Sequence, residues 1–259
     1  MADPSSINAD IFYRHGQGST DCRRNAGQQR RFKIFPVAER LVGCGFVNRA
    51  FFSALLTAFV VAPVFTESVA AATVTFVSPC ECQSQKSGSR WPAKTDPSPV
   101  PLDKSTIQSV TPSQIYEWKG PEPNVPLTPG TDTRIPAEQK WYNLTARLVS
   151  VKVEADGDIT LVLQDADSKK AGSVNAEIPV GLEWCQLRKL VFGWTTQSFP
   201  FSFKASQRLE MREQHVITVT GKAVFDVDHA SADRSNRRTK PKKYSVWEIH
   251  PVMALQVDQ

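Results

Sequence analysis

Two carboxylates in one short turn are the first residues of this sequence that could do chemistry. Asp156 and Asp158 flank Gly157 between two runs of β-forming residues. Carboxylate oxygens bind hard cations, but such a cation needs several of them, and a single turn offers too few. Asp and Gly also accept the positive φ of a tight hairpin. We therefore predict a hairpin turn without a metal, and keep Asp156 and Asp158 as catalytic candidates.

A second group of acids and histidines lies near the C-terminal end. Its members are Asp226, Asp228, His229, Glu248 and His250. Imidazole and carboxylate groups on neighbouring strands can ligate zinc or form an acid–base pair. Side chains alternate along a strand, so Glu248 and His250 would share the face opposite to Trp247, towards solvent or a groove. Because no short-spaced ligand pair anchors a site, we expect solvated side chains and retain His229, Glu248 and His250 as catalytic candidates.

A basic run without an intervening acid is the third candidate. Its residues are Arg234, Arg237, Arg238, Lys240, Lys242 and Lys243. Such a run could bind an anionic polymer, namely a nucleic acid or a glycan, or a lipid head group, and Tyr244 would offer a stacking face at its edge. Most charge runs are solvated loops, and that alternative stays open.

Three cysteines follow the N-terminal region: Cys80, Cys82 and Cys185. A disulfide is permitted if the protein is exported to an oxidising compartment. Cys185 could pair with Cys80 or with Cys82, and the sequence does not choose between them. The remaining thiol could link two chains.

Five runs of alternating β-forming residues have to position these side chains. They cover residues 142–153, 159–164, 173–179, 215–226 and 244–257. Between the third and fourth runs, apolar residues recur at helical spacing from Leu187 to Trp194. This order is that of an OB barrel, and Gly221 would allow a bulge. We predict a mainly β protein whose residues 141–259 form a five-stranded OB-like barrel with one helix between strands three and four; an open α+β sheet is the alternative.

The region before the barrel, residues 72–140, holds 11 of the 18 prolines. Its Pro-Ser-Pro-rich strings are typical of extended, poorly packed chain. Thr111 before Pro112 could cap a short helix on which Ile115 and Trp118 share a face. We predict a Pro-rich linker with one turn docked on the barrel.

Residues 1–71 have the features of a targeting region. Residues 50–66 carry no charge, basic residues precede them and small residues follow, as in a secretory signal peptide. The basic segment is long for a signal, so we expect the true start near Val47; an uncleaved membrane anchor is the alternative. Cleavage would lower the net charge from +5 to +2. We expect a soluble mature form, secreted or periplasmic, whose overall charge gives no argument for a nucleic-acid partner.

A resemblance to uncharacterised exported bacterial proteins covers residues 110–259. It rests on the spacing of the strings VEADGDITLVLQD, EIP, VTGKAVFDVDH, NRR and WEIHPVMAL, and it implies export but no activity. The Asp-Gly-Asp turn in the first hairpin also resembles staphylococcal-type nucleases, which are OB barrels. That resemblance implies a calcium ligand at Asp158, although the Arg and the Asp-Thr-Pro-Glu-like string of those nucleases are missing.

These observations favour an exported, non-enzymatic OB-like binding module for an anionic polymer or an envelope protein, with no cofactor. The alternative is a divalent-metal-dependent hydrolase of nuclease type, which would use Asp156 and Asp158 or the region of His229 and His250. An apolar content of 41% and a charged content of 22% exclude collagen, a coiled coil, a polytopic membrane protein and full disorder.

Overall fold

The computed structural model describes residues 74–80, 89–128, 130–167, 170, 172–203 and 206–258. The predicted signal peptide, start site and alternative anchor lie outside these residues. Within the described ranges, no helix combines the length and the apolar character needed to cross a bilayer.

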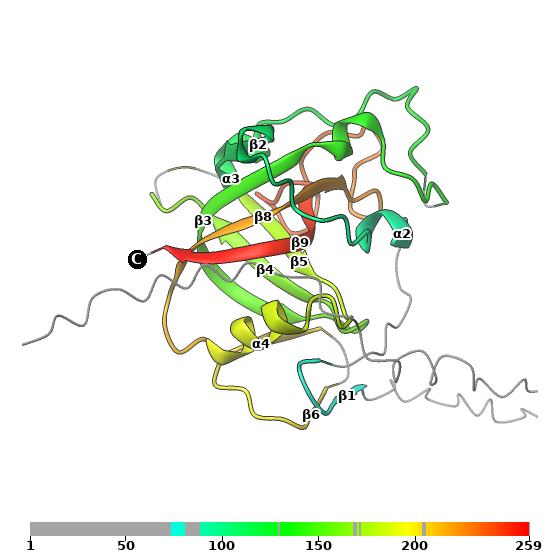
Figure 1. The fold of residues 1–259 in the computed structure, drawn as a ribbon. Coiled ribbons are helices and arrows are strands. Elements are labelled where there is room, and N and C mark those ends of the chain that lie inside the picture. Colours follow the sequence, from blue (N-terminus) through cyan, green and yellow to red (C-terminus); the bar gives the residue numbers. More distant parts are fainter. Residues whose placement is uncertain are drawn as a thin grey trace, which may run out of the picture. The chain divides into compact units, whose positions relative to one another are not determined.

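Five strands close into a barrel (Figure 1). They are β3 (Trp141–Val153), β4 (Ile159–Gln164), β5 (Ser173–Ile178), β8 (Val216–Phe225) and β9 (Trp247–Asp258). Neighbours pair in the order β3-β4-β5-β9-β8, and β8 pairs again with β3. The long strand β3 closes the ring, because its residues 147–153 pair with β4 and its residues 141–147 pair with β8.

The strand order confirms the predicted mainly β, OB-like barrel. The predicted helix between the third and fourth barrel strands is α4 (Cys185–Gly193). The β5–β9 pair is parallel, whereas the other pairs of the ring are antiparallel. The register of β8 and β9 shifts at Gly221, where a Cβ would lie 2.4 Å from the Pro251 carbonyl oxygen, so the predicted bulge is also confirmed.

Alternation along the strands fills the barrel. On β3, Leu144, Ala146 and Leu148 are fully buried, and Ile159 and Leu161 of β4 join the same core. Burial of one such Leu or Ile side chain contributes about 1.5–3 kcal/mol. The interior is therefore apolar, and the polar side chains of these strands lie on the other face.

The described part of the Pro-rich region is built into the fold. It forms α2 (Trp91–Lys94), η1 (Lys104–Thr106), β2 (Ile107–Val110), α3 (Pro112–Tyr116) and η2 (Pro136–Gln139). Strand β2 extends the sheet by parallel pairing with β3. The Thr111 side chain caps α3 as predicted, Ile115 is fully buried, and the Trp118 ring lies 4.9 Å from that of Tyr142. The predicted docked turn is confirmed, but the poorly packed chain expected around it is instead ordered against the barrel.

One buried ion pair fixes this region from the inside. Arg90 and Glu138 make two contacts of 2.6 and 2.7 Å, and neither side chain is exposed. The Glu138 carboxylate also accepts backbone N–H groups of Ile135 and of Phe225 in β8. The pair therefore joins α2 and η2 to the barrel wall.

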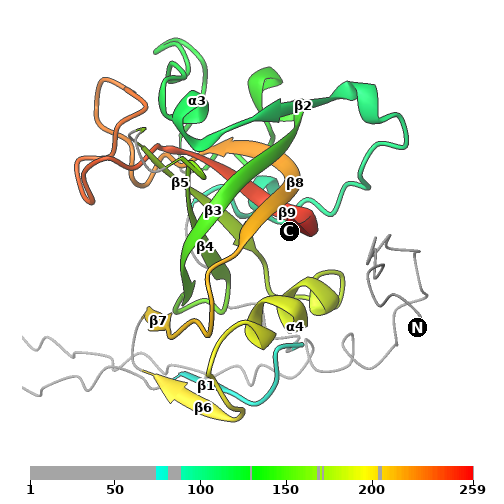
Figure 2. The same ribbon diagram turned by 90° about the vertical axis from the view of Figure 1, so that its left-hand side faces the viewer.

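The described residues also form three short strands: β1 (Val74–Phe76), β6 (Phe201–Phe203) and β7 (Gln207–Leu209). Figure 2 shows β1 and β6 with α4 at one end of the barrel, away from α3. A disulfide between Cys80 and Cys185 ties the segment after β1 to the first residue of α4. Of the two pairings that the sequence allowed, the structure has this one, and Cys82 lies outside the described residues.

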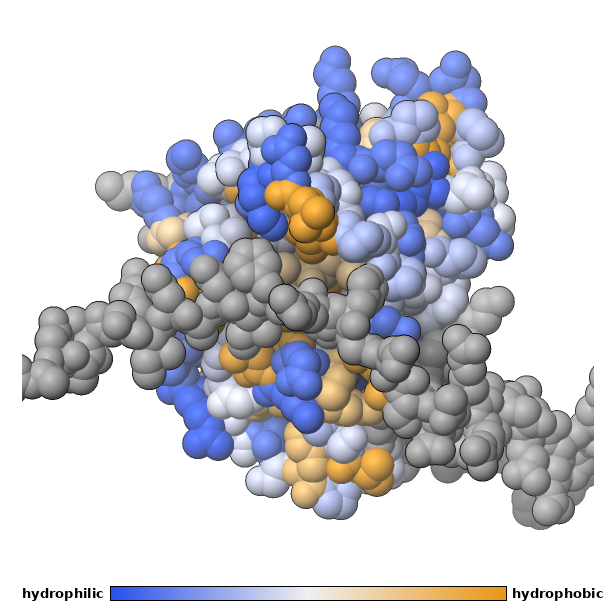
Figure 3. Space-filling view, viewed as in Figure 1, coloured by the Kyte–Doolittle hydropathy of each residue, from blue (hydrophilic) through white to orange (hydrophobic). Residues whose placement is uncertain are grey.

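The molecular face in Figure 3 is largely hydrophilic, with apolar residues in separate patches. Large apolar side chains with high exposure include Val77, Leu102 and Val257. Single exposed apolar residues are normal for a globular protein.

Candidate metal centre

Strands β4, β5 and β9 carry polar side chains on the face that points away from the core. Leu161, Ala176 and Ile249 point into the barrel. The side chains between them form what we call the polar face: Thr160, Asn175, Glu177, Glu248 and His250.

One parallel pairing decides which of these side chains meet. Ala176 of β5 lies opposite Ile249 of β9, so the next residues, Glu177 and His250, are neighbours. Glu177 Oε2 lies 3.1 Å from His250 Nδ1. One step earlier, Asn175 Nδ2 donates to Glu248 Oε1 at 3.3 Å.

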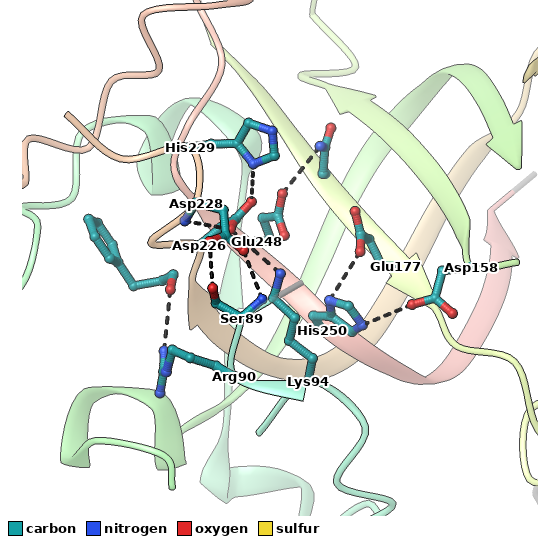
Figure 4. Close-up of polar contacts among 12 residues, drawn as sticks. Ser89, Arg90, Lys94, Asp158, Glu177, Asp226, Asp228, His229, Glu248 and His250 are labelled. Carbon is teal, nitrogen blue, oxygen red and sulfur yellow. Dashed lines mark hydrogen bonds and ion pairs between the residues drawn. The ribbon is translucent and has the colours of Figure 1, made fainter. Parts of the chain in front are cut away.

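The Asp-Gly-Asp turn places a third side chain, that of Asp158, next to Glu177 and His250. The turn forms as predicted, with Gly157 at a φ of 95°. Asp158 Oδ1 accepts a hydrogen bond from the Val180 N–H at 3.0 Å, and Oδ2 lies 3.6 Å from His250 Nε2. Asp158, Glu177 and His250, the cation triad, each offer one ligand atom within 4.8 Å of the others (Figure 4).

The imidazole at the centre of the cation triad is buried and lacks hydrogen bonds. His250 is 1% exposed and Asp158 is 2% exposed. Neither ring nitrogen of His250 has a hydrogen-bond partner of acceptable geometry. A buried polar atom without a partner costs about 1–3 kcal/mol. A cation bound to the imidazole would use the lone pair of one ring nitrogen and remove the cost at that nitrogen, while the other nitrogen would carry the proton towards the second carboxylate.

A second set of charges adjoins the cation triad. Arg238 forms a buried ion pair with Glu248 and lies 3.5 Å from Asp226 Oδ2. Lys94 of α2 lies 3.5 Å from Asp226 Oδ1, and His229 Nδ1 lies 2.5 Å from Asp226 Oδ2. Burial alone would raise the pKa of Asp226, but the His229 hydrogen bond and the two cations outweigh it and hold that pKa far below its usual range.

Two further pKa shifts reflect burial and the carboxylates that surround this site. Burial and the repulsion from Glu248 raise the pKa of Glu177 well above its usual value, and Lys94 offsets only part of this rise. Burial would lower the pKa of Lys94, but Asp226 and Glu248 outweigh it and raise that pKa.

A count of the charged side chains around the cation triad also gives an excess of acidic groups. Four carboxylates (Asp158, Glu177, Asp226, Glu248) accompany two permanent cations (Lys94, Arg238). The carboxylates therefore outnumber the lysine and arginine cations by two, and the hydrogen bond to Asp226 raises the pKa of His229, which favours a positive charge there and offsets part of this excess.

The donor set selects the kind of cation. Metal–ligand bonds of roughly 2.0–2.2 Å place two ligands of one ion no more than about 4.4 Å apart, so the triad needs to close by a few tenths of an ångström. One imidazole nitrogen and carboxylate oxygens suit zinc, manganese or iron, whereas calcium and magnesium favour oxygen alone. Three protein ligands leave coordination positions open for water or a bound group, as in catalytic sites.

The structure joins some of the predicted catalytic candidates and separates others. Asp158 and His250 meet in the cation triad, while Asp156 accepts a hydrogen bond from the Asp158 N–H and belongs to the turn. Glu248 and His250 lie opposite to Trp247 as predicted. The expected solvation is wrong, because Glu248 and His250 are 2% and 1% exposed. Arg238 from the β8–β9 loop pairs with Glu248 of this face, and Lys94 from α2 pairs with the adjoining Asp226.

Sequence reasoning did not find Glu177, the third member of the cation triad. It was assigned to a strand and to the EIP string of the resemblance, but not to a site, and its facing partner Thr160 was taken to weaken a metal role for the turn. The signal was available in part: Glu177 is an acid at a position where the neighbouring β5 residues Ala176 and Ile178 are apolar and buried.

The predicted basic run divides between the fold and the surface. Arg234 donates to three backbone carbonyls of the 122–127 segment, and Arg238 is buried beside Glu248. The Arg237 guanidinium stacks 3.5 Å from the Tyr116 ring centre. Tyr244 is half-buried. The exposed cations of the run are Lys240, Lys242 and Lys243.

Comparison with known proteins adds no relative. No protein-family model, no curated protein and no solved structure matches the chain. The resemblances to exported bacterial proteins and to staphylococcal-type nucleases therefore stay predictions.

Proposed function

We propose that this protein binds a divalent transition-metal cation at Asp158, Glu177 and His250. The single observation that carries the proposal is the buried His250 imidazole, whose two nitrogens lie 3.1 and 3.6 Å from two carboxylates without a hydrogen bond to either. The excess negative charge around it supports the same conclusion.

The position of the centre in the fold supports a functional role for the cation. OB folds bind their ligands on the face of the second and third strands, between the loop that joins strands one and two and the loop that joins strands four and five. Here those strands are β4 and β5. The first loop supplies Asp158, and the second supplies Arg238. The open coordination positions would admit water or an anionic group of a ligand, which is the chemistry of a metal-dependent hydrolase.

Metal titration tests this proposal. The full chain, stripped with a chelator, is titrated with Mn²⁺ and the free ion is followed by electron paramagnetic resonance. We expect one Mn²⁺ per chain, and a loss of affinity of at least about tenfold in His250→Gln, which removes one ligand. The matched control is His229→Gln, since that histidine is half-exposed and outside the cation triad.

Two results would contradict the proposal. One is the absence of stoichiometric Mn²⁺ and Zn²⁺ binding to the folded wild-type chain. The other is equal affinity in the two histidine variants. Either result would show that His250 is not a ligand of a cation in this protein.

A second candidate function is the binding of an anionic polymer or head group at the exposed lysines of the basic run. Lys243 accepts the Ser173 N–H at its backbone carbonyl, which places it at the start of β5. Glu177 is four residues further along the strand, or about 13 Å at a rise of about 3.3 Å per residue. A polymer of a few units would thus span both the lysines and the cation.

Replacement of Lys240, Lys242 and Lys243 by Ala tests this second candidate. We expect weaker, less salt-dependent binding of a labelled single-stranded oligonucleotide, measured by anisotropy, because each lost phosphate contact lowers the salt slope by roughly one. The control replaces three other exposed lysines, Lys119, Lys140 and Lys189. Equal effects of the two triple variants would refute the site, and a response to added Mn²⁺ would connect it to the cation.

A further inference from the structure

One buried arginine holds the backbone on both sides of the cation triad. Arg188 of α4 has no exposed surface. Its guanidinium donates to the carbonyl oxygens of Gly157 at 2.9 Å, of Ile178 and Pro179 at 3.2 Å each, and of Pro79 at 2.7 Å.

Two of these carbonyls belong to residues adjacent to proposed ligands. Gly157 directly precedes Asp158, and Ile178 directly follows Glu177. Arg188 therefore fixes the distance between the turn that carries one carboxylate and the strand end that carries the other. A planar guanidinium with several fixed donors can bridge four carbonyls in this way, whereas a single ammonium cannot.

The disulfide fixes the arginine in turn. Cys185 begins α4 one turn before Arg188, and Cys80 follows Pro79, the fourth carbonyl partner. The same covalently tied segment carries Phe76, whose ring lies 3.2 Å from where a Cβ on Gly157 would be. The disulfide thus joins the helix that carries Arg188 to the segment that covers the Asp-Gly-Asp turn.

We infer that Arg188 is a positioning residue for the cation triad and that the Cys80–Cys185 disulfide makes cation affinity depend on redox state. This inference rests on the proposed cation site. In the oxidised chain the backbone on both sides of the triad is held close to its binding geometry. A dithiol reductant would open the bond: its two thiols become a disulfide, and their two electrons and two protons convert Cys80 and Cys185 to thiols. The segment around Pro79 is then free to leave Arg188, and the turn that carries Asp158 loses one support.

Mn²⁺ affinity in the full chain measures this dependence. Mn²⁺ is the probe because zinc would also bind the newly formed thiols. The background carries Cys22→Ser, Cys44→Ser and Cys82→Ser, so that only Cys80 and Cys185 can pair. The binding constants of the oxidised chain, of the chain reduced with a phosphine, and of the further Cys80→Ser/Cys185→Ser variant are compared.

We expect the reduced chain and the serine variant to bind Mn²⁺ about tenfold more weakly, the lower end of the roughly 10–100-fold effect of residues that orient metal ligands. Arg188→Lys in the oxidised chain should show a loss of similar size. Arg212→Lys is its control, because Arg212 also donates to a backbone carbonyl, that of Thr195, away from the triad. Circular dichroism confirms that each compared chain is folded.

The outcomes separate the two proposals. Binding within twofold in the oxidised and the reduced folded chains overturns the redox dependence and leaves the cation site intact. If reduction unfolds the chain, the oxidised Arg188→Lys variant decides: affinity equal to that of Arg212→Lys refutes the positioning role. No binding by the oxidised background chain refutes the cation site itself, and the inference with it.

Discussion

Loss of one charge from the Arg90–Glu138 pair should destabilise the whole domain, although both residues lie in the Pro-rich region. In Glu138→Gln, the amide NH₂ group would face the Arg90 guanidinium, which has only donors and cannot accept a hydrogen bond from it. Arg90 is 1% exposed and Glu138 is fully buried, so water cannot solvate the charge that remains. Breaking a buried pair in this way costs about 3–5 kcal/mol.

The expected change is large compared with the stability of a domain. Native domains are stable by about 5–15 kcal/mol. With a urea dependence of about 2 kcal/mol per molar, a loss of about 3–5 kcal/mol lowers the urea midpoint by about 1.5–2.5 M. The matched control is Glu117→Gln, which removes an ion pair of Arg237 whose side chains are 40% and 73% exposed. An exposed pair contributes about 0–1 kcal/mol, so this midpoint should hardly move.

Urea unfolding followed by tryptophan fluorescence and by far-ultraviolet circular dichroism measures both variants. The double variant Arg90→Leu/Glu138→Leu completes the test, because replacement of a whole buried pair by apolar side chains is often neutral or stabilising. We therefore expect it to be more stable than Glu138→Gln alone. Equal midpoints for Glu138→Gln and Glu117→Gln would refute the reasoning and would mean that residues 89–140 are not part of the cooperative unit.

Three further results follow from the structure. Glu177→Gln should raise the urea midpoint of the metal-free chain at pH 7, because it removes the repulsion from Glu248, and should at the same time weaken Mn²⁺ binding. The pKa of Asp226 is lower in the folded than in the unfolded chain, so its contribution to stability is present above about pH 4 and is lost as the pH falls further; midpoints measured from pH 6 to pH 2 should decline less in Asp226→Asn. Thr111→Ala removes the capping box of α3 and should lower the free energy of unfolding by about 1 kcal/mol, measured by the same urea titration.

The barrel was predictable because its signals are local. The Asp-Gly turn between two alternating runs predicted the first hairpin, and Gly221 predicted the bulge. Thr111 followed by Pro112 predicted the start of α3. Each of these depends on the conformation that a few adjacent residues prefer, and the structure agrees with all three.

The Pro-rich region was harder to predict because its stability is not local. Its proline strings have the composition of a linker, yet β2 pairs with β3, and Arg90 meets Glu138 across 48 positions of sequence. The choice of Cys80 as the partner of Cys185 is of the same kind, since it depends on how α4 docks on the barrel end. Amino-acid composition predicts the conformation of an isolated segment. The strand pairing, the ion pair and the disulfide form only when the segment can pack against the folded barrel.

The candidate site was half predictable for the same reason. Alternation placed Glu248 and His250 on one face, but the meeting of Glu177 with His250 depends on the parallel register Ala176–Ile249, which two strands 73 residues apart do not reveal in sequence. Their burial could not be predicted either, because Lys94 belongs to a region that was predicted to be a linker, and Arg238 to a loop that was expected to be solvated.

The loss of folding stability that the polar face causes is the strongest argument that this face has a function. Val162 occupies the same face of β4 and is 4% exposed, so an apolar side chain fits there. Apolar residues in place of Glu177, Glu248 and His250 would remove the buried excess of negative charge and the imidazole without hydrogen bonds. They would not lower the strand propensity of these positions. Natural sequences break such local rules mainly at functional sites. The expected gain in stability of metal-free Glu177→Gln measures this directly: a stability lowered for the sake of binding rises when the ligand residue is neutralised, whereas a purely structural carboxylate would leave the chain weaker when lost.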